Sequence, residues 1–123
     1  GVSVIEVAAT QGGWQQVLPS RYARRIHGNT PMRIAGPAAG APAMRTALDP
    51  AGDTVLGTLA NCAMGVTPWG TYLTCEENFQ GYFGGPGKAP ADLPGSLRRY
   101  GVAPGAQWLY WGPHDARVDV TRN

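Results

Sequence analysis

Chemically active side chains are concentrated between residues 61 and 79, where two thiols lie close to two adjacent carboxylates. The thiols belong to Cys62 and Cys75, and the carboxylates belong to Glu76 and Glu77. Thiolates favour softer metals such as iron or zinc, whereas carboxylates favour hard cations such as calcium. A thiol and carboxylates on neighbouring strands are therefore candidate ligands of a mixed metal site.

The spacing limits how many of these groups can meet. If residues 71–76 form a strand, side chains alternate between its faces, so Cys75 and Glu76 point opposite ways. Glu77 then returns to the Cys75 side unless the strand has ended, so at most one carboxylate points at a given site unless the backbone turns there. Asn78 and Gly81 indicate that it does turn. Two other interpretations stay open. The glutamates are solvated and the cysteines pack as small hydrophobes, or a Cys62–Cys75 disulfide crosses a hairpin.

The composition indicates which elements position these groups. The 123 residues include 18 glycines and 11 prolines, and both residue types break helices. An apolar share of 43% suffices for a packed core, and the length allows one ordinary domain at most. The net charge of +2 is too small to indicate a nucleic-acid partner. The sequence contains no run of about 18 apolar residues, so no membrane span is expected. An all-β arrangement of short strands is favoured.

The first half of the chain predicts one hairpin and a long loop. Residues 2–8 and 14–18 read as two strands joined at the turn Gly12–Gly13. Residues 21–27 suit a helical turn or an irregular segment. Residues 28–52 read as loop, because prolines recur there among glycines and alanines.

The second half predicts further short strands. Residues 54–60 and 71–76 read as a strand pair joined by a loop, an apolar run follows at 107–111, and another strand starts at 117–120. Short strands joined by turns rich in glycine and proline are typical of a sandwich, barrel or propeller. A propeller blade takes roughly 40–50 residues, so the chain holds two to three blades' worth of strands.

Two long motifs carry a family resemblance. The first reads NCAMGVTPWGTYLTCEEN over residues 61–78, and the second reads RRIHGNTPMR over residues 24–33, followed by GPAAG over residues 36–40. Together with the opening GVSV, these motifs resemble the PhoX-type alkaline phosphatases over most of residues 1–83. The resemblance is specific, because the first motif is long and rich in Trp, Cys and Pro.

This resemblance implies a monomeric, periplasmic or secreted enzyme that hydrolyses phosphate monoesters with iron and calcium ions. It also implies a large β-propeller, of which residues 1–123 would be a single fragment. By position, Cys62 would be the thiolate ligand of iron. Glu76 and Glu77 would supply carboxylates to calcium or iron, with Glu77 preferred. Catalytic and substrate-binding residues are not assigned.

The sequence departs from the family pattern in two ways. Met64 stands where a small residue is expected beside the cysteine ligand. In the family, the remaining metal ligands and the phosphate-binding residue come later in the sequence; they are further glutamates, an aspartate and an arginine. Residues 84–114 of this chain contain no Glu, so the full set of ligands cannot be assembled from it. We therefore expect a phosphatase whose isolated fragment 1–123 is inactive. The alternatives are a non-catalytic propeller fragment or binding module, and a small calcium-binding β domain that uses Glu76 and Glu77.

Overall fold

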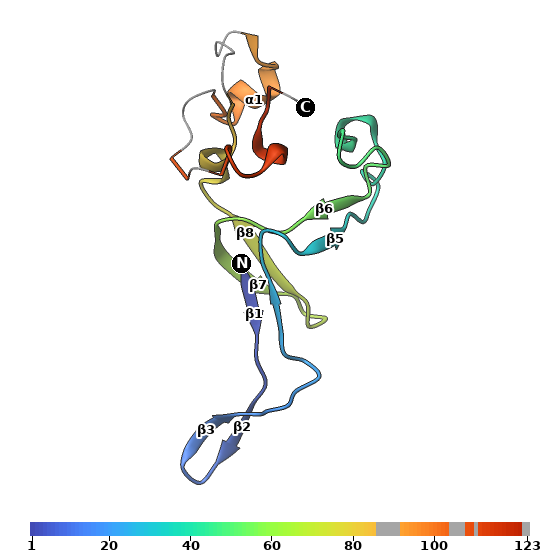
Figure 1. Ribbon diagram of the computed structural model, residues 1–123. Helices are drawn as coiled ribbons and strands as arrows, with labels where there is room; N and C mark the ends of the chain where they lie inside the picture. The colour runs from blue at the N-terminus through green and yellow to red at the C-terminus, as the bar shows by residue number, and fades with distance from the viewer. Residues whose placement is uncertain (86–91, 104–107, 110, 122–123) are drawn as a thin grey trace. The chain divides into compact units, whose positions relative to one another are not determined.

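The computed structural model describes residues 1–85, 92–103, 108, 109 and 111–121. Within these residues eight short strands form four two-stranded sheets (Figure 1). The chain divides into a first unit, residues 1–33 and 55–77, and a second unit, residues 34–54 and 78–123. The prediction of an all-β chain is confirmed: the single α-helix described, α1 (Gly95–Arg99), has five residues. The strands are β1 (Val2–Val4), β2 (Val7–Thr10), β3 (Gly13–Gln16), β4 (Arg24–Ile26), β5 (Pro31–Arg33), β6 (Thr54–Leu56), β7 (Asn61–Val66) and β8 (Tyr72–Glu76).

The β2–β3 hairpin confirms the turn predicted at Gly12–Gly13. Gly13 adopts a φ of 108°, which glycine tolerates, and the Thr10 hydroxyl donates to the Gly13 carbonyl at 2.7 Å. Residues 2–8, however, form two strands, and β1 pairs with β4 instead of joining β2. The helical turn considered for residues 21–27 is therefore wrong. A seven-residue helix is marginal, whereas β4 gains a ladder of backbone hydrogen bonds from β1.

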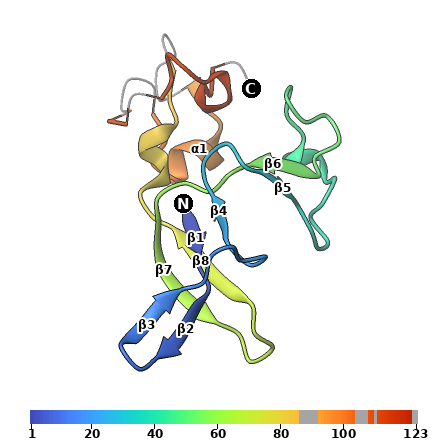
Figure 2. The same cartoon turned by 60° about the horizontal axis from the view of Figure 1, so that its bottom comes forward.

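The strand pairing predicted in the second half is also wrong. β6 pairs with β5, which lies inside the expected loop 28–52, and β8 pairs with β7. The sequence pattern assigned Gly65 to a loop, because glycine is typical of loops. Gly65 lies inside β7, so only a short turn separates β7 from β8. In that turn Thr67 donates its amide to the Thr71 carbonyl at 2.9 Å, and the two threonine hydroxyls lie 2.7 Å apart. Figure 2 shows β7 and β8 running side by side from this turn.

A small apolar core belongs to the second unit. Leu93, Val102 and Val120 are buried together, and Phe83 and Leu97 pack against them. The 3₁₀ helices are η1 (Pro42–Met44), η2 (Phe79–Tyr82) and η4 (Ala116–Val118). The strand expected from residue 117 is therefore replaced by η4, whose start is capped by the Asp115 side chain, and only an isolated bridge joins Gly84 to Asp119. Residues 107 and 110 of the expected run 107–111 lie outside the described residues, and the others form no strand.

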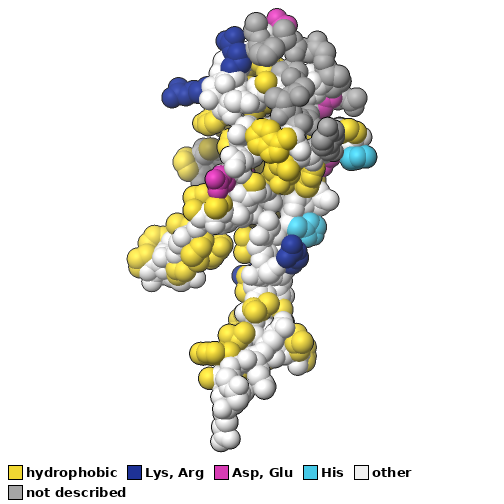
Figure 3. Space-filling view, turned by 90° about the vertical axis from the view of Figure 1, so that its left-hand side faces the viewer, with side chains coloured by type: hydrophobic (Ala, Val, Ile, Leu, Met, Phe, Trp, Pro, Cys, Tyr) yellow, Lys and Arg dark blue, Asp and Glu magenta, His cyan; other side chains and the backbone are white. Residues whose placement is uncertain are grey.

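The first unit, in contrast, buries none of its described apolar side chains. All four buried hydrophobic residues of the described chain lie in the second unit. The first unit exposes Trp14 by 74% and Trp69 by 77%, and Figure 3 shows how widely hydrophobic side chains appear on one face of the molecule. Isolated two-stranded hairpins are at best marginally stable in water. The sheet that carries the candidate ligands therefore depends on local hydrogen bonds for its geometry.

Gly57→Ala is expected to destabilise the protein by about 2–5 kcal/mol, because two costs add. Gly57 has a φ of 70°, and a Cβ there would overlap the backbone of Gly28. Gly65→Ala is the matched control, since a Cβ at Gly65 meets nothing within 4 Å and its φ is ordinary. The control should change stability by no more than about 0.5 kcal/mol. Thermal unfolding of both variants checks this, and equal melting temperatures would contradict it.

Candidate metal-ligand site

A β-bulge lies in the β7–β8 pair at the first candidate ligand. Asn61 pairs with Glu76 and Met64 pairs with Thr74, so Cys62 and Ala63 together stand opposite the single residue Cys75. A bulge of this kind bends its strand and changes the direction of a side chain, and bulges are common beside active sites. Cys62 therefore occupies an irregular backbone position that a plain strand pattern does not reveal.

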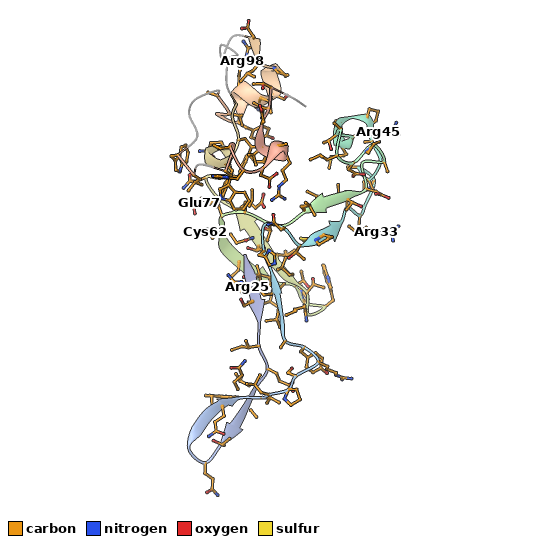
Figure 4. All side chains as sticks on the ribbon, in the orientation of Figure 1. Arg25, Arg33, Arg45, Cys62, Glu77 and Arg98 are labelled. Carbon is orange, nitrogen blue, oxygen red and sulfur yellow. The ribbon has the colours of Figure 1, made fainter. Side chains whose placement is uncertain are left out.

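The side chains of Cys62 and Glu77 lie near one another at this bulge (Figure 4). The Glu77 amide donates to the Ala60 carbonyl at 2.9 Å, which holds Glu77 beside the start of β7. The Glu77 carboxylate raises the pKa of the Cys62 thiol, first as a hydrogen-bond acceptor and then through its negative charge, and desolvation of the thiol adds a smaller increase. The two groups thus place a sulfur donor and a carboxylate donor at one exposed position.

Glu76 is directed elsewhere. Its Oε1 accepts a hydrogen bond from the Leu59 amide at 2.6 Å. This difference between neighbouring glutamates is the alternation expected of a strand, because Glu76 is the last residue of β8 and Glu77 follows it. Of the three residues expected to bind metal, the structure brings Cys62 and Glu77 together and leaves Glu76 apart.

Asn61 is a residue of this region that the sequence analysis did not identify. Its Nδ2 donates to the Thr58 hydroxyl at 2.7 Å and to the Thr74 hydroxyl at 3.3 Å. Its Oδ1 is buried and has no hydrogen-bond partner among the described residues. The one signal in the sequence was an amide side chain directly before the cysteine, and such residues more often mark turns.

The donor set fits part of a metal site. A thiolate suits iron and a carboxylate suits calcium or iron, and both side chains are accessible. Within the described residues, no three His, Cys, Asp or Glu side chains lie close enough together to hold an ion. Cys62 and Glu77 are thus two candidate ligands, and no third side chain of these types joins them in the described part of the chain.

The two other expectations about this segment also have an outcome. Cys62 and Cys75 are both free thiols, so the disulfide is not formed. Met64, which stands where a small residue was expected, begins the regular part of the ladder and leaves 57% of its surface exposed.

Glu77→Gln is expected to speed alkylation of Cys62 in the metal-free protein several-fold at pH 8. The carboxylate raises the pKa of the thiol, so removing its charge lowers that pKa and increases the fraction of reactive thiolate. Iodoacetamide labelling followed by peptide mass spectrometry gives the rate. Glu76→Gln is the control and should leave the rate unchanged, because Glu76 contacts Leu59. An unchanged rate in Glu77→Gln would show that the two side chains do not meet.

Comparison with known proteins shows which family contains this chain. A family model described as alkaline phosphatase PhoX matches residues 1–123. The solved structure of Pseudomonas fluorescens PhoX in complex with vanadate, a transition state analogue, is 54% identical in sequence, with a TM-score of 0.90. The match covers 100% of this chain and 21% of that chain, so this chain spans about a fifth of its length. No curated protein matched the sequence. The chain belongs to the PhoX family of alkaline phosphatases.

Proposed function

We propose that the protein containing this chain is an alkaline phosphatase that hydrolyses phosphate monoesters. The observation that supports this most is the 54% identity, over the whole of this chain, to a PhoX whose structure contains a transition state analogue. That structure is a complex with vanadate, which its description calls a transition state analogue. Because this chain spans a fifth of the relative, the activity is proposed for the protein that contains it.

The PhoX family is one of metal-dependent phosphatases. For this protein we propose iron and calcium, with the Cys62 thiolate bound to iron and the Glu77 carboxylate bound to calcium or iron. When bound, such ions neutralise a phosphoryl group and lower the pKa of an attacking water. In this chain the bulge presents the thiol, and the Glu77–Ala60 hydrogen bond keeps the carboxylate beside it. A coordinating thiol is deprotonated, so Cys62 would hold a metal as the thiolate, without the proton that it donates toward Glu77 in the metal-free chain.

Several properties of the whole protein follow from the same proposal. Enzymes of this family are in general periplasmic or secreted, and we propose the same location here. Among the described residues there is no helix of the length and apolarity needed to cross a bilayer. We further propose that the strands of this chain form part of a β-propeller in a monomeric enzyme.

The test is to purify the protein as its natural host makes it, then measure its metal content and its activity. Hydrolysis of p-nitrophenyl phosphate at alkaline pH, with iron and calcium both present by mass spectrometry, is the expected result. Chelation should abolish the activity, and returning calcium should restore it at least in part. A protein free of phosphatase activity with neither metal would overturn the proposal.

The absence of a three-ligand group among the described side chains favours one second candidate, a non-catalytic binding module. Metal content separates the candidates. Iron with calcium supports the phosphatase, and neither metal supports the binding module. Calcium alone supports the remaining possibility raised by the sequence, a calcium-binding β domain.

A further inference from the structure

The segment that leads into Cys62 has an unusual backbone. Gly57 and Ala60 both have positive φ values, 70° and 47°, and for alanine this conformation is unfavourable. Such a conformation persists only when its surroundings hold it. Cys62 lies two residues beyond Ala60, so whatever holds Ala60 also sets where β7 begins.

Two consecutive residues of the opposite strand end hold this segment. The Glu76 Oε1 accepts from the Leu59 amide at 2.6 Å, and the Glu77 amide donates to the Ala60 carbonyl at 2.9 Å. Hydrogen bonds to a carboxylate are shorter and stronger than neutral ones. The backbone is therefore fixed on both sides of the Leu59–Ala60 peptide, and Glu76 supplies the charged contact.

The residues at this end of the β7–β8 pair have different roles. Asn61 and Glu76 are paired in register, and Asn61 donates to the Thr74 hydroxyl, so Asn61, Thr74 and Glu76 share one face. Cys62 and Glu77 follow Asn61 and Glu76 by one residue each, and their side chains lie near one another (Figure 4). The Asn61–Thr74–Glu76 face thus secures the backbone, and the sulfur and carboxylate donors lie at the bulge and just beyond the end of β8.

We propose that Glu76 is a positioning residue, which holds the Leu59–Ala60 segment and thereby fixes the Cys62 thiol relative to the Glu77 carboxylate, and is not itself a metal ligand. The inference rests on the proposed function for its metals, but its geometric part stands on the hydrogen bonds of this chain alone. The two adjacent glutamates look equivalent in the motif. The proposal gives them different roles: Glu76 positions the backbone, and Glu77 provides a carboxylate for the metal.

The amide substitutions of the two glutamates separate the two roles. In Glu76→Gln the amide carbonyl still accepts from the Leu59 amide, so metal content and kcat should stay within about twofold of the natural protein. In Glu77→Gln a neutral amide replaces a metal-binding carboxylate, so bound metal should be lost. If Glu76→Gln loses as much metal as Glu77→Gln, Glu76 is a ligand and the proposal is overturned.

Glu76→Ala removes the contact to Leu59 altogether. We expect kcat to fall about 10–100-fold with a smaller change in KM, as is typical when the support of a metal ligand is lost. After removal of metal, the alkylation rate of Cys62 should change, whereas that of Cys75 should not. Where Glu76→Ala fails to fold, Glu76→Asp replaces it, because aspartate keeps the charge but is too short to reach the Leu59 amide. A variant of either kind with unaltered kcat and unaltered Cys62 alkylation would refute the positioning role.

These readouts keep the inference apart from the proposed function. A natural protein without metal or activity would defeat the proposed function, yet the alkylation rates would still report whether Glu76 orients Cys62. Conversely, an active metalloprotein in which Glu76→Gln and Glu76→Ala behave alike would defeat only the inference, because rescue by glutamine is its distinguishing result.

Discussion

Cys62→Ser is expected to remove the iron from the protein and to lower phosphatase activity by about 100-fold or more. A serine hydroxyl is a poor substitute, because it stays protonated near neutral pH and lacks the soft sulfur that suits iron. Loss of a supporting contact alone typically costs about 10–100-fold, so loss of the ligand itself should cost at least as much. Iron content by mass spectrometry and kcat with p-nitrophenyl phosphate measure the two effects.

Cys75→Ser is the matched control for this substitution. Cys75 is the same residue type, is also an exposed free thiol, and stands across the bulge from Cys62. The control should keep both its iron and its activity. If Cys62→Ser retained full iron, or if the two serine variants lost it equally, the assignment of Cys62 would be wrong.

The isolated 123-residue chain is expected to lack phosphatase activity and to leave its first unit unprotected against hydrogen exchange. Among its described residues that unit contains two-stranded pairs and no buried apolar side chain, so local opening of β7 and β8 costs little free energy. The second unit has a small core around Val102 and Val120. Its amides should exchange at least about tenfold more slowly than those of β7 and β8. Exchange followed by mass spectrometry resolves the two units.

The natural protein provides the reference for this measurement. There, we expect β7 and β8 to be protected, because the rest of a protein of this family would cover side chains such as Trp69, which is 77% exposed here. Strong protection of β7 and β8 in the isolated chain would contradict the prediction and show that hydrogen bonds alone stabilise the hairpin.

The sequence predicted those elements that depend on local signals. The β2–β3 hairpin was predictable, because Gly12 and Gly13 separate two strand-forming runs and permit the turn. The pairing of β6 with β5 was not, because it joins segments that are distant in sequence and depends on tertiary packing. β7 was missed for a related reason: a glycine inside a strand resembles a loop until the partner strand is known.

The candidate site shows the same division between local and distant information. Residue types singled out two thiols and two adjacent carboxylates, and the family resemblance then selected Cys62, Glu76 and Glu77. Strand alternation separated the two glutamates only if the backbone did not turn after the strand, so the sequence left their difference open. The bulge could not be predicted, because it is a property of the register between two strands. The Leu59 contact of Glu76 depends on that register too, so its distinct environment emerges only from the structure.

The extra residue in β7 also determines how this segment tolerates a deletion. Loss of Ala63 would remove the bulge and place Cys62 alone opposite Cys75 in a regular ladder. Directly opposed cysteines of adjacent antiparallel strands lie near the separation that a disulfide requires. In an oxidising compartment such a shortened chain would tend to crosslink its own hairpin. The single inserted residue thus keeps Cys62 as a free thiol that can bind a metal, and without it Cys62 would tend to form a disulfide with Cys75.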